Sequence, residues 1–153
     1  MPNKNTYHYK EINIELRHFL NEKENVGGKI VFFNSIEIDR ITSDSYVQKP
    51  YLYSYKNDVF ILFIEEADEG GIWGYIVYFI KNKKVFKSGY LNISSVEDAL
   101  PFNQKFMECV DSNDKINFKI VPTEYFDTSN YEVKKSSSFK AYLSKKDGKI
   151  YYK

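Results

Sequence analysis

Apolar residues in the first part of the chain recur at a spacing that fits a helix. The apolar positions that form the helical stripe are Ile12, Leu16, Phe19 and Leu20. Residues 25–28 then supply an asparagine and two glycines, which commonly end helices. The competing pattern is a strand, because Ile12, Ile14 and Leu16 also alternate. We favour an N-terminal helix over residues 10–23, preceded by a flexible polar tail at 1–6.

Two neighbouring segments in the middle of the chain, 59–66 and 72–82, are apolar on both faces of a strand. Such strands lie in the middle of a sheet and are covered on both sides. We predict that they pair through a hairpin loop over residues 65–71. Shorter strand-type patterns occur at 29–33, 36–41, 51–56, 85–93, 116–121, 139–143 and 150–152. Asp147-Gly148 between the last two is a good hairpin turn.

A second helix is predicted near residues 95–110. The sequence starting at Ser94 combines a serine cap with a carboxylate three residues later. An apolar stripe follows at Phe102, Phe106 and Val110. Residues 123–138 are polar and are expected to form a long loop that can be mobile. The order of elements predicts one α+β domain over residues 1–153, with a mainly antiparallel sheet of six to seven strands.

Composition narrows the class of protein. Hydrophobic residues make up 42% of the 153 residues and aromatic residues 18%, which indicates a folded chain. The net charge of +1 and the presence of only two arginines argue against nucleic-acid binding. A single cysteine, a polar N-terminus and the lack of an apolar run of about 20 residues favour a cytoplasmic protein without a membrane segment.

Candidate catalytic residues are few. His8 and His18 are ten positions apart in sequence, and no cysteine or further histidine stands at metal-ligand spacing from them. Either could act as the base of a small ribonuclease-like hydrolase together with Glu15. Cys109 lies beside an apolar stripe, which favours a core position over a nucleophile. We therefore expect no catalytic set, no bound metal and no cofactor.

The densest acidic segment is the best candidate for a binding site. Its carboxylates are Glu65, Glu66, Asp68 and Glu69. An acidic loop on a rigid hairpin would complement a basic enzyme cleft and accelerate association. Trp73 and Tyr75 follow directly and could add aromatic contacts. A solvated loop is the plainer interpretation of the same charges.

A second candidate surface is a stripe of tyrosines on one predicted strand. Tyr51, Tyr53 and Tyr55 would share one face of that strand. They could form a stacking platform or a binding patch, or they could simply cover a half-buried sheet. A small-molecule cavity beneath this face is a further alternative.

In composition alone, the chain resembles immunity proteins of bacterial toxin systems and small phage-encoded inhibitors, which are compact, aromatic and near neutral. The resemblance implies a non-enzymatic protein that neutralises a nuclease-type toxin by covering its active site. The alternatives are an inhibitor of a host defence enzyme and a hydrolase that uses His8 or His18. In the first two cases the expected partner is a protein.

Overall fold

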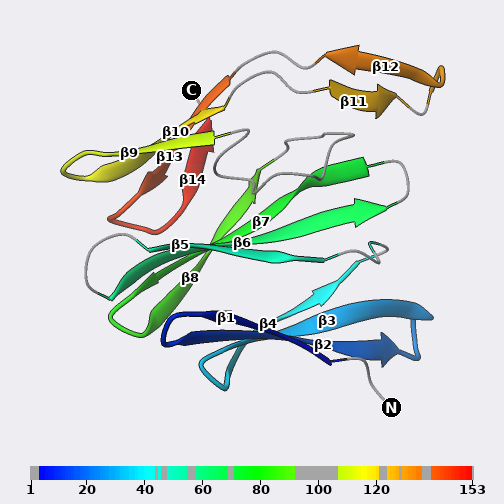
Figure 1. The fold of residues 1–153 in the computed structure, drawn as a ribbon, viewed down its shortest axis with the longest axis horizontal. Coiled ribbons are helices and arrows are strands. Elements are labelled where there is room, and N and C mark those ends of the chain that lie inside the picture. The colour runs from blue at the N-terminus through cyan, green and yellow to red at the C-terminus, as the bar shows by residue number, and fades with distance from the viewer. Residues whose placement is uncertain are drawn as a thin grey trace. The chain divides into compact units, whose positions relative to one another are not determined.

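The computed structural model is built from β-strands (Figure 1). It describes residues 4–43, 45, 48–54, 58–68, 71–91, 107–120, 124–127, 129–135 and 139–152. Within these ranges there is no helix, so the predicted α+β class is wrong. The strands are β1 (Lys4–Tyr9), β2 (Ile12–Asn21), β3 (Val26–Phe33), β4 (Ile36–Thr42), β5 (Pro50–Ser54), β6 (Val59–Asp68), β7 (Gly71–Lys81), β8 (Lys84–Leu91), β9 (Met107–Asp111), β10 (Lys115–Ile120), β11 (Glu124–Asp127), β12 (Glu132–Lys135), β13 (Phe139–Ser144) and β14 (Ile150–Tyr152).

The predicted N-terminal helix is the strand β2. It pairs antiparallel with β1 on one side and with β3 on the other. Ile14 and Leu16 are fully buried, as the alternating pattern required. Ile12 and Leu16 fit both a helical stripe and a strand face, so pairing with two neighbours decides between the two structures. β1 also begins at Lys4, within the residues expected to form a tail.

The prediction of a second helix near residues 95–110 is wrong for the residues that the structure describes there. Residues 107–111 form β9, which pairs antiparallel with β10. The remainder of the predicted helix, including Phe102 and Phe106, lies outside the described residues. Cys109 therefore lies on a strand, opposite Phe118 in the register, and not on a helix.

Two compact units make up the chain, Met1–Tyr46 and Val47–Lys153. The N-terminal unit is a sheet in the order β1-β2-β3-β4. One face of this sheet carries the fully buried Ile14, Leu16 and Val31, and the other carries both arginines of the chain. Arg17 binds Glu15 at 2.8 Å and Arg40 binds Glu37 at 2.5 Å. Opposite charges therefore lie beside each other on the face that carries the arginines.

The glycines expected to end a helix lie instead within β3. A Cβ atom on Gly28 would stand 2.7 Å from a ring carbon of Phe19, its cross-strand partner. The aromatic ring thus covers the glycine, and the close approach of the two strands requires a residue without a side chain.

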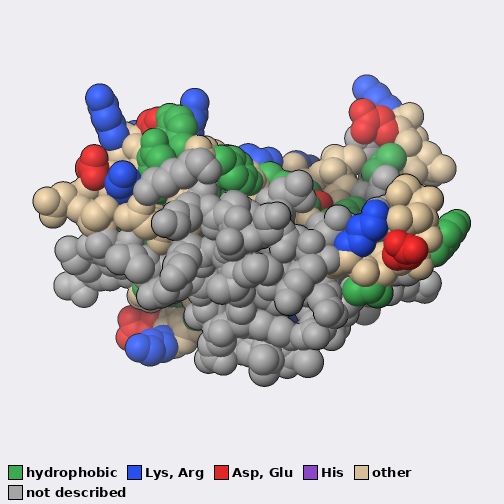
Figure 2. Space-filling view, turned by 90° about the horizontal axis from the view of Figure 1, so that it is seen from above, with side chains coloured by type: hydrophobic (Ala, Val, Ile, Leu, Met, Phe, Trp, Pro, Cys, Tyr) green, Lys and Arg blue, Asp and Glu red, His purple; other side chains and the backbone are tan. Residues whose placement is uncertain are grey.

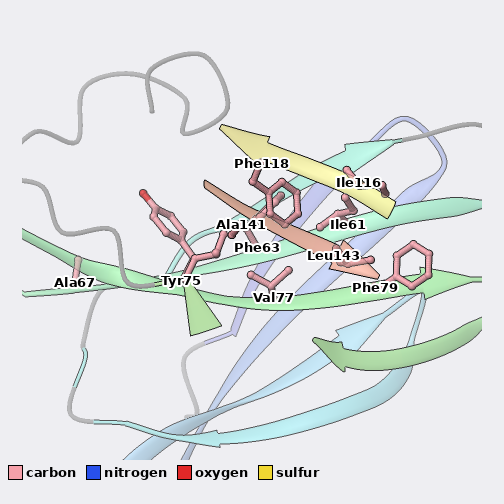
Figure 3. Packing of buried hydrophobic residues seen from close by; sticks show 11 residues of the cluster. Ile61, Phe63, Ala67, Tyr75, Val77, Phe79, Ile116, Phe118, Ala141 and Leu143 are labelled. Atoms are coloured by element: carbon pink, nitrogen blue, oxygen red, sulfur yellow. The ribbon is translucent and has the colours of Figure 1, made fainter. Parts of the chain in front are cut away.

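In the C-terminal unit, two four-stranded antiparallel sheets share one hydrophobic core. Their strand orders are β5-β6-β7-β8 and β14-β13-β10-β9. The core takes side chains from both sheets, including Phe63 and Val77 from the first and Phe118 and Leu143 from the second (Figure 3). The rings of Phe63 and Phe118 meet edge to face, with centroids 6.1 Å apart. This packing is typical of a β-sandwich.

The central pair of strands is predicted correctly. β6 and β7 pair directly and occupy the middle of their sheet, and consecutive residues of both are buried. Both strands extend further than expected, however. β6 runs to Asp68 and β7 begins at Gly71, with a bulge between Glu66 and Ala67. Most of the predicted hairpin loop is therefore part of the strands.

A small two-stranded hairpin lies within the segment that was expected to be a long loop. β11 pairs antiparallel with β12 as a separate sheet. In Figure 1 these two strands run side by side at the top of the view, with their turn at the outer end. The last pair before the turn is Asp127 with Glu132, which leaves a loop of four residues.

Candidate functional site

The carboxylates predicted to form an exposed loop are largely interior. Glu65 is 2% exposed and Glu66 is 9% exposed, because the strand carries both of them into the sheet. The side chain of Asp68, and Glu69 as a whole, lie outside the described residues. In the folded structure, Glu65 and Glu66 are therefore too buried to attract a positively charged partner to this hairpin.

Glu65 belongs to a buried cluster with two tyrosines. The hydroxyl of Tyr51 donates a hydrogen bond of 2.9 Å to Oε2 of Glu65. Tyr75 lies directly opposite Glu65 on β7, and its ring meets that of Tyr51 edge to face at 6.4 Å. Burial raises the pKa of Tyr75 well above its usual value, and the charge of Glu65 raises it further. In Figure 3, Tyr75 lies between Ala67 and the other labelled side chains of the core, and Phe79 lies at the opposite side of the view.

Glu66 belongs to a second cluster with another tyrosine. Glu66 lies opposite Gly74, and a Cβ atom on Gly74 would stand 2.6 Å from the ring of Tyr90. The ring of Tyr90 thus occupies the place of a side chain at Gly74. Burial raises the pKa of Tyr90 to about 12, and the charges of Glu66 and Tyr152 contribute to the rise.

The two carboxylates point to opposite faces of one sheet, because they are neighbours on a strand. A glycosidase needs its carboxylates to face each other across a cleft. Glu65 and Glu66 cannot form that pair. A binding role for Glu65, Glu66, Tyr75 and the partly buried Trp73 stays a prediction, and it would require this end of the sheet to open.

The two histidines are not brought together. His8 lies opposite Asn13 across β1 and β2, and its Nδ1 is 2.5 Å from Oδ1 of Asn13. Asn13 and His18 are five residues apart on β2, so the alternation of the strand places the histidines on opposite faces. Glu15, the expected helper of a histidine base, accepts two hydrogen bonds from Arg17.

The tyrosine stripe on β5 lies on the core. Tyr51 and Tyr53 are partly buried and pack against the hydrophobic cluster, and Tyr55 is outside the described residues. The described part of this stripe therefore covers a half-buried sheet face, as the plainest of the three sequence-based interpretations predicted.

Several large hydrophobic side chains remain exposed elsewhere. On the face drawn in Figure 2, hydrophobic side chains reach the surface beside lysines and carboxylates. Tyr151 and Tyr152 are 40% and 54% exposed, and both contact other residues of the chain. The ring of Tyr151 stacks on Tyr142 at 5.3 Å, and the hydroxyl of Tyr152 donates to the backbone oxygen of Tyr90. These tyrosines tie β14 to its neighbours.

The most exposed of these side chains belongs to the turn of the β11–β12 hairpin. Tyr131 is 80% exposed and Val133 is 58% exposed. We call residues 129–133 the hairpin tip. Tyr131 has a φ of +59°, which is unusual for a bulky residue.

The side chain of Asn130 shapes the hairpin tip. Its Oδ1 accepts a hydrogen bond of 3.2 Å from the backbone N–H of Glu132, and its Nδ2 lies 3.4 Å from Oε2 of Glu132. An asparagine that binds the backbone two residues ahead forms a compact local turn. Tyr131 stands inside this turn and presents its ring to solvent.

Sequence reasoning missed the hairpin tip, although a signal for it exists. Residues 127–130 are Asp, Thr, Ser and Asn, all of which favour turns. They stand between two short segments that contain aromatic and β-branched residues, at 124–126 and 131–133. The neighbouring serines and lysines made the whole region look like a polar loop.

Comparisons with known proteins assign no function to these features. No protein-family model matches the chain, and a search of curated proteins finds no significant match. Across the described ranges, histidine, cysteine and carboxylate side chains form no group of three that could hold a metal ion. The same part of the chain has no helix long and apolar enough to cross a membrane.

Proposed function

We propose that this chain is a non-enzymatic protein-binding inhibitor of the immunity type, which uses the hairpin tip to cover the active site of a toxin or a host defence enzyme. The observation that carries the proposal is the 80% exposure of Tyr131 at the end of a two-stranded hairpin. Tyrosines are frequent hot spots of protein interfaces, and most of the surface of this one is open to a partner.

The local geometry of the hairpin tip supports this role. Oδ1 of Asn130 accepts a hydrogen bond from the N–H of Glu132, so the backbone on either side of Tyr131 is joined by a local contact. A local contact of this kind lowers the entropy lost on association. Val133 is exposed two residues further on and would widen the apolar contact. A narrow hairpin with such a tip fits a concave surface, such as an enzyme cleft, better than a flat one.

The proposal is tested with a partner captured by the immobilised full-length chain from its native host. We expect Tyr131→Ala to weaken the affinity by about 30-fold or more, which corresponds to about 2 kcal/mol for a hot spot. Tyr152→Ala is the matched control, since Tyr152 is also exposed but donates to the backbone of Tyr90. Its affinity should change by less than about threefold. A partner that binds the Tyr131→Ala variant normally would contradict the proposal.

A further inference from the structure

We infer that one end of the C-terminal unit binds single-stranded nucleic acid, with phosphates on the exposed lysines of two neighbouring turns and a base on the ring of Tyr151. The turns are β7–β8 and β13–β14. We call their exposed lysines the lysine end; its members are Lys81, Lys83, Lys84, Lys146 and Lys149. This inference does not rest on the proposed function, because it concerns another surface and another partner.

The lysines of the β7–β8 turn continue the core-facing side of their sheet. Phe79 and Phe86 are cross-strand partners; Phe79 belongs to the core cluster and Phe86 packs against it. Lys81 and Lys84 form the next pair on the same face, because alternate residues of a strand point to one side. Nζ of Lys84 lies 5.1 Å from the centroid of the Phe86 ring. Both lysines therefore lie on the side of the sheet that faces the second sheet.

The β13–β14 turn of the second sheet lies against the same ring. A Cβ atom on Gly148 would stand 2.7 Å from Cβ of Phe86, so this turn touches β8. The contact between the two strands continues at Gly89, where a Cβ atom would stand 3.8 Å from Cβ of Ile150. Lys146 and Lys149 are on either side of Gly148 in the turn. Two turns that are distant in sequence thus bring their lysines to one end of the unit.

Two carboxylates lie beside the lysine end. The backbone oxygen of Asp58 accepts a hydrogen bond from the N–H of Asn82, and Asp147 belongs to the β13–β14 turn. Within the part of the chain that the structure describes, three of the lysines form no ion pair; these are Lys81, Lys83 and Lys146. The lysine end therefore keeps an excess of positive charge that ion pairs within the chain do not neutralise.

The net charge of +1 conceals this excess, because basic and acidic residues are separated along the β6–β7 pair. Lys81 pairs with Val59 at one end of the two strands. Glu65 and Glu66 lie toward the other end, where both are buried. The argument from composition against nucleic-acid binding therefore does not apply to this surface, since phosphates respond to the local charge.

An exposed aromatic ring stands beside these cations. The hydroxyl of Tyr151 donates a hydrogen bond to Asp147, which places the ring next to the β13–β14 turn. The ring stacks on Tyr142 with centroids 5.3 Å apart, and Nζ of Lys115 lies 4.9 Å from the centroid of the Tyr142 ring. Tyr151 is 40% exposed, and β14 is at the edge of its sheet. The ring is therefore accessible to a base.

Cations beside an accessible ring fit single-stranded nucleic acid better than other anionic partners. Proteins that bind it attract the phosphates with basic side chains and stack bases on aromatic rings. A membrane surface fits less well, because the described residues of the two turns include no exposed aliphatic side chain that would insert into lipid. An acidic protein surface also fits less well, because protein interfaces are enriched in arginine and depleted of lysine.

The test measures fluorescence anisotropy of labelled oligothymidylate and oligouridylate with the purified full chain at low salt. We expect at least one of them to bind with a dissociation constant on the order of micromolar. The logarithm of the affinity should fall with the logarithm of the salt concentration with a slope of about −2 to −3, as three or four phosphate contacts require. No binding of either oligonucleotide at about 100 μM chain would overturn the inference.

Charge reversals locate the site. Lys84→Glu and Lys146→Glu, one from each turn, should each weaken binding at least about fivefold and make the salt dependence shallower. Lys23→Glu is the matched control, because it changes the net charge equally at an exposed position between β2 and β3 of the N-terminal unit. It should weaken binding less than about twofold. Melting curves check that each variant is folded. An equal loss in Lys23→Glu would show that net charge alone governs binding and would overturn the inference.

The ring of Tyr151 distinguishes a single strand from other polyanions. Tyr151→Ala should weaken binding at least about fivefold, whereas Tyr151→Phe keeps the ring, loses the hydrogen bond to Asp147 and should change binding less than about twofold. Vesicles with phosphatidylserine and polyglutamate serve as the other anionic probes. Tighter binding of either probe than of both oligonucleotides, or unchanged oligonucleotide binding in Tyr151→Ala, would overturn the inference.

Discussion

The β6–β7 and β11–β12 hairpins carry similar residues at their ends and place them in opposite surroundings. The first has Glu65 and Tyr75 facing each other across the strands, both within 2% of full burial. The second has Glu132 and Tyr131 next to each other at its turn, and both are exposed. Carboxylates next to aromatic rings are therefore an interior cluster in one hairpin and a surface feature in the other.

The number of neighbouring strands explains the difference. β6 and β7 each pair on both edges, and their sheet packs on a second sheet through the shared core. β11 and β12 pair only with each other among the described strands. A hairpin without further neighbours has fewer surfaces that can cover its side chains. How deeply the side chains of a hairpin are buried thus depends on which other strands pack against it. The residue types within the hairpin do not reveal this.

The largest expected effect is the loss of a core ring. Phe63→Ala should lower the free energy of unfolding by about 3–5 kcal/mol, because Phe63 is buried between the two sheets. Val133→Ala at the hairpin tip should change it by less than about 0.5 kcal/mol. Urea denaturation followed by circular dichroism measures both variants. Similar losses would mean that the β11–β12 hairpin is as well packed as the core.

Two tyrosines near the carboxylates of β6, Tyr75 on β7 and Tyr90 on β8, should make the fold sensitive to alkaline pH. Tyr75 and Tyr90 both have a raised pKa in the folded chain, the latter reaching about 12 from the usual 10.0. A raised pKa contributes stability that is complete below the unfolded value and declines as pH rises through the folded value. Stability should therefore fall from about pH 10 upward.

Urea midpoints at several alkaline pH values test this expectation. The decline should be shallower in Tyr90→Phe, which removes one of the titrating hydroxyls and keeps the ring over Gly74. Midpoints that stay constant between pH 9 and about pH 11 would contradict the raised pKa values of these two tyrosines.

The sequence predicted the central strands because their pattern has a single interpretation. A run such as 59–66, apolar at nearly every position, is too short for a typical helix and fits a strand covered on both sides. The Asp147-Gly148 turn was equally predictable, since Gly148 has a φ of +70° that glycine adopts readily. The central strands and this turn are both determined by the residue types within the segment itself.

The N-terminal strands were not predictable in the same way. In residues 10–23 the helical and strand periodicities share Ile12 and Leu16, and the two glycines that seemed to end a helix accommodate the close approach of Phe19. Only pairing with β1 and β3 resolves the ambiguity, and the periodicity of residues 10–23 by itself does not reveal that pairing. Burial of Glu65 likewise depends on contacts with other strands, so the candidate site differs from the one predicted.

A paired charge reversal tests the contrast between the two hairpins most directly. Glu65→Lys and Glu132→Lys each turn a carboxylate into an ammonium at the end of a hairpin, and urea midpoints of the purified chains give the free energy of unfolding. We predict a loss of about 3–5 kcal/mol for Glu65→Lys, because it buries a charge without a matching partner. Glu132→Lys should change the free energy of unfolding by less than about 0.5 kcal/mol, because Glu132 is exposed. Equal losses, or a Glu65→Lys variant as stable as the original chain, would contradict the account.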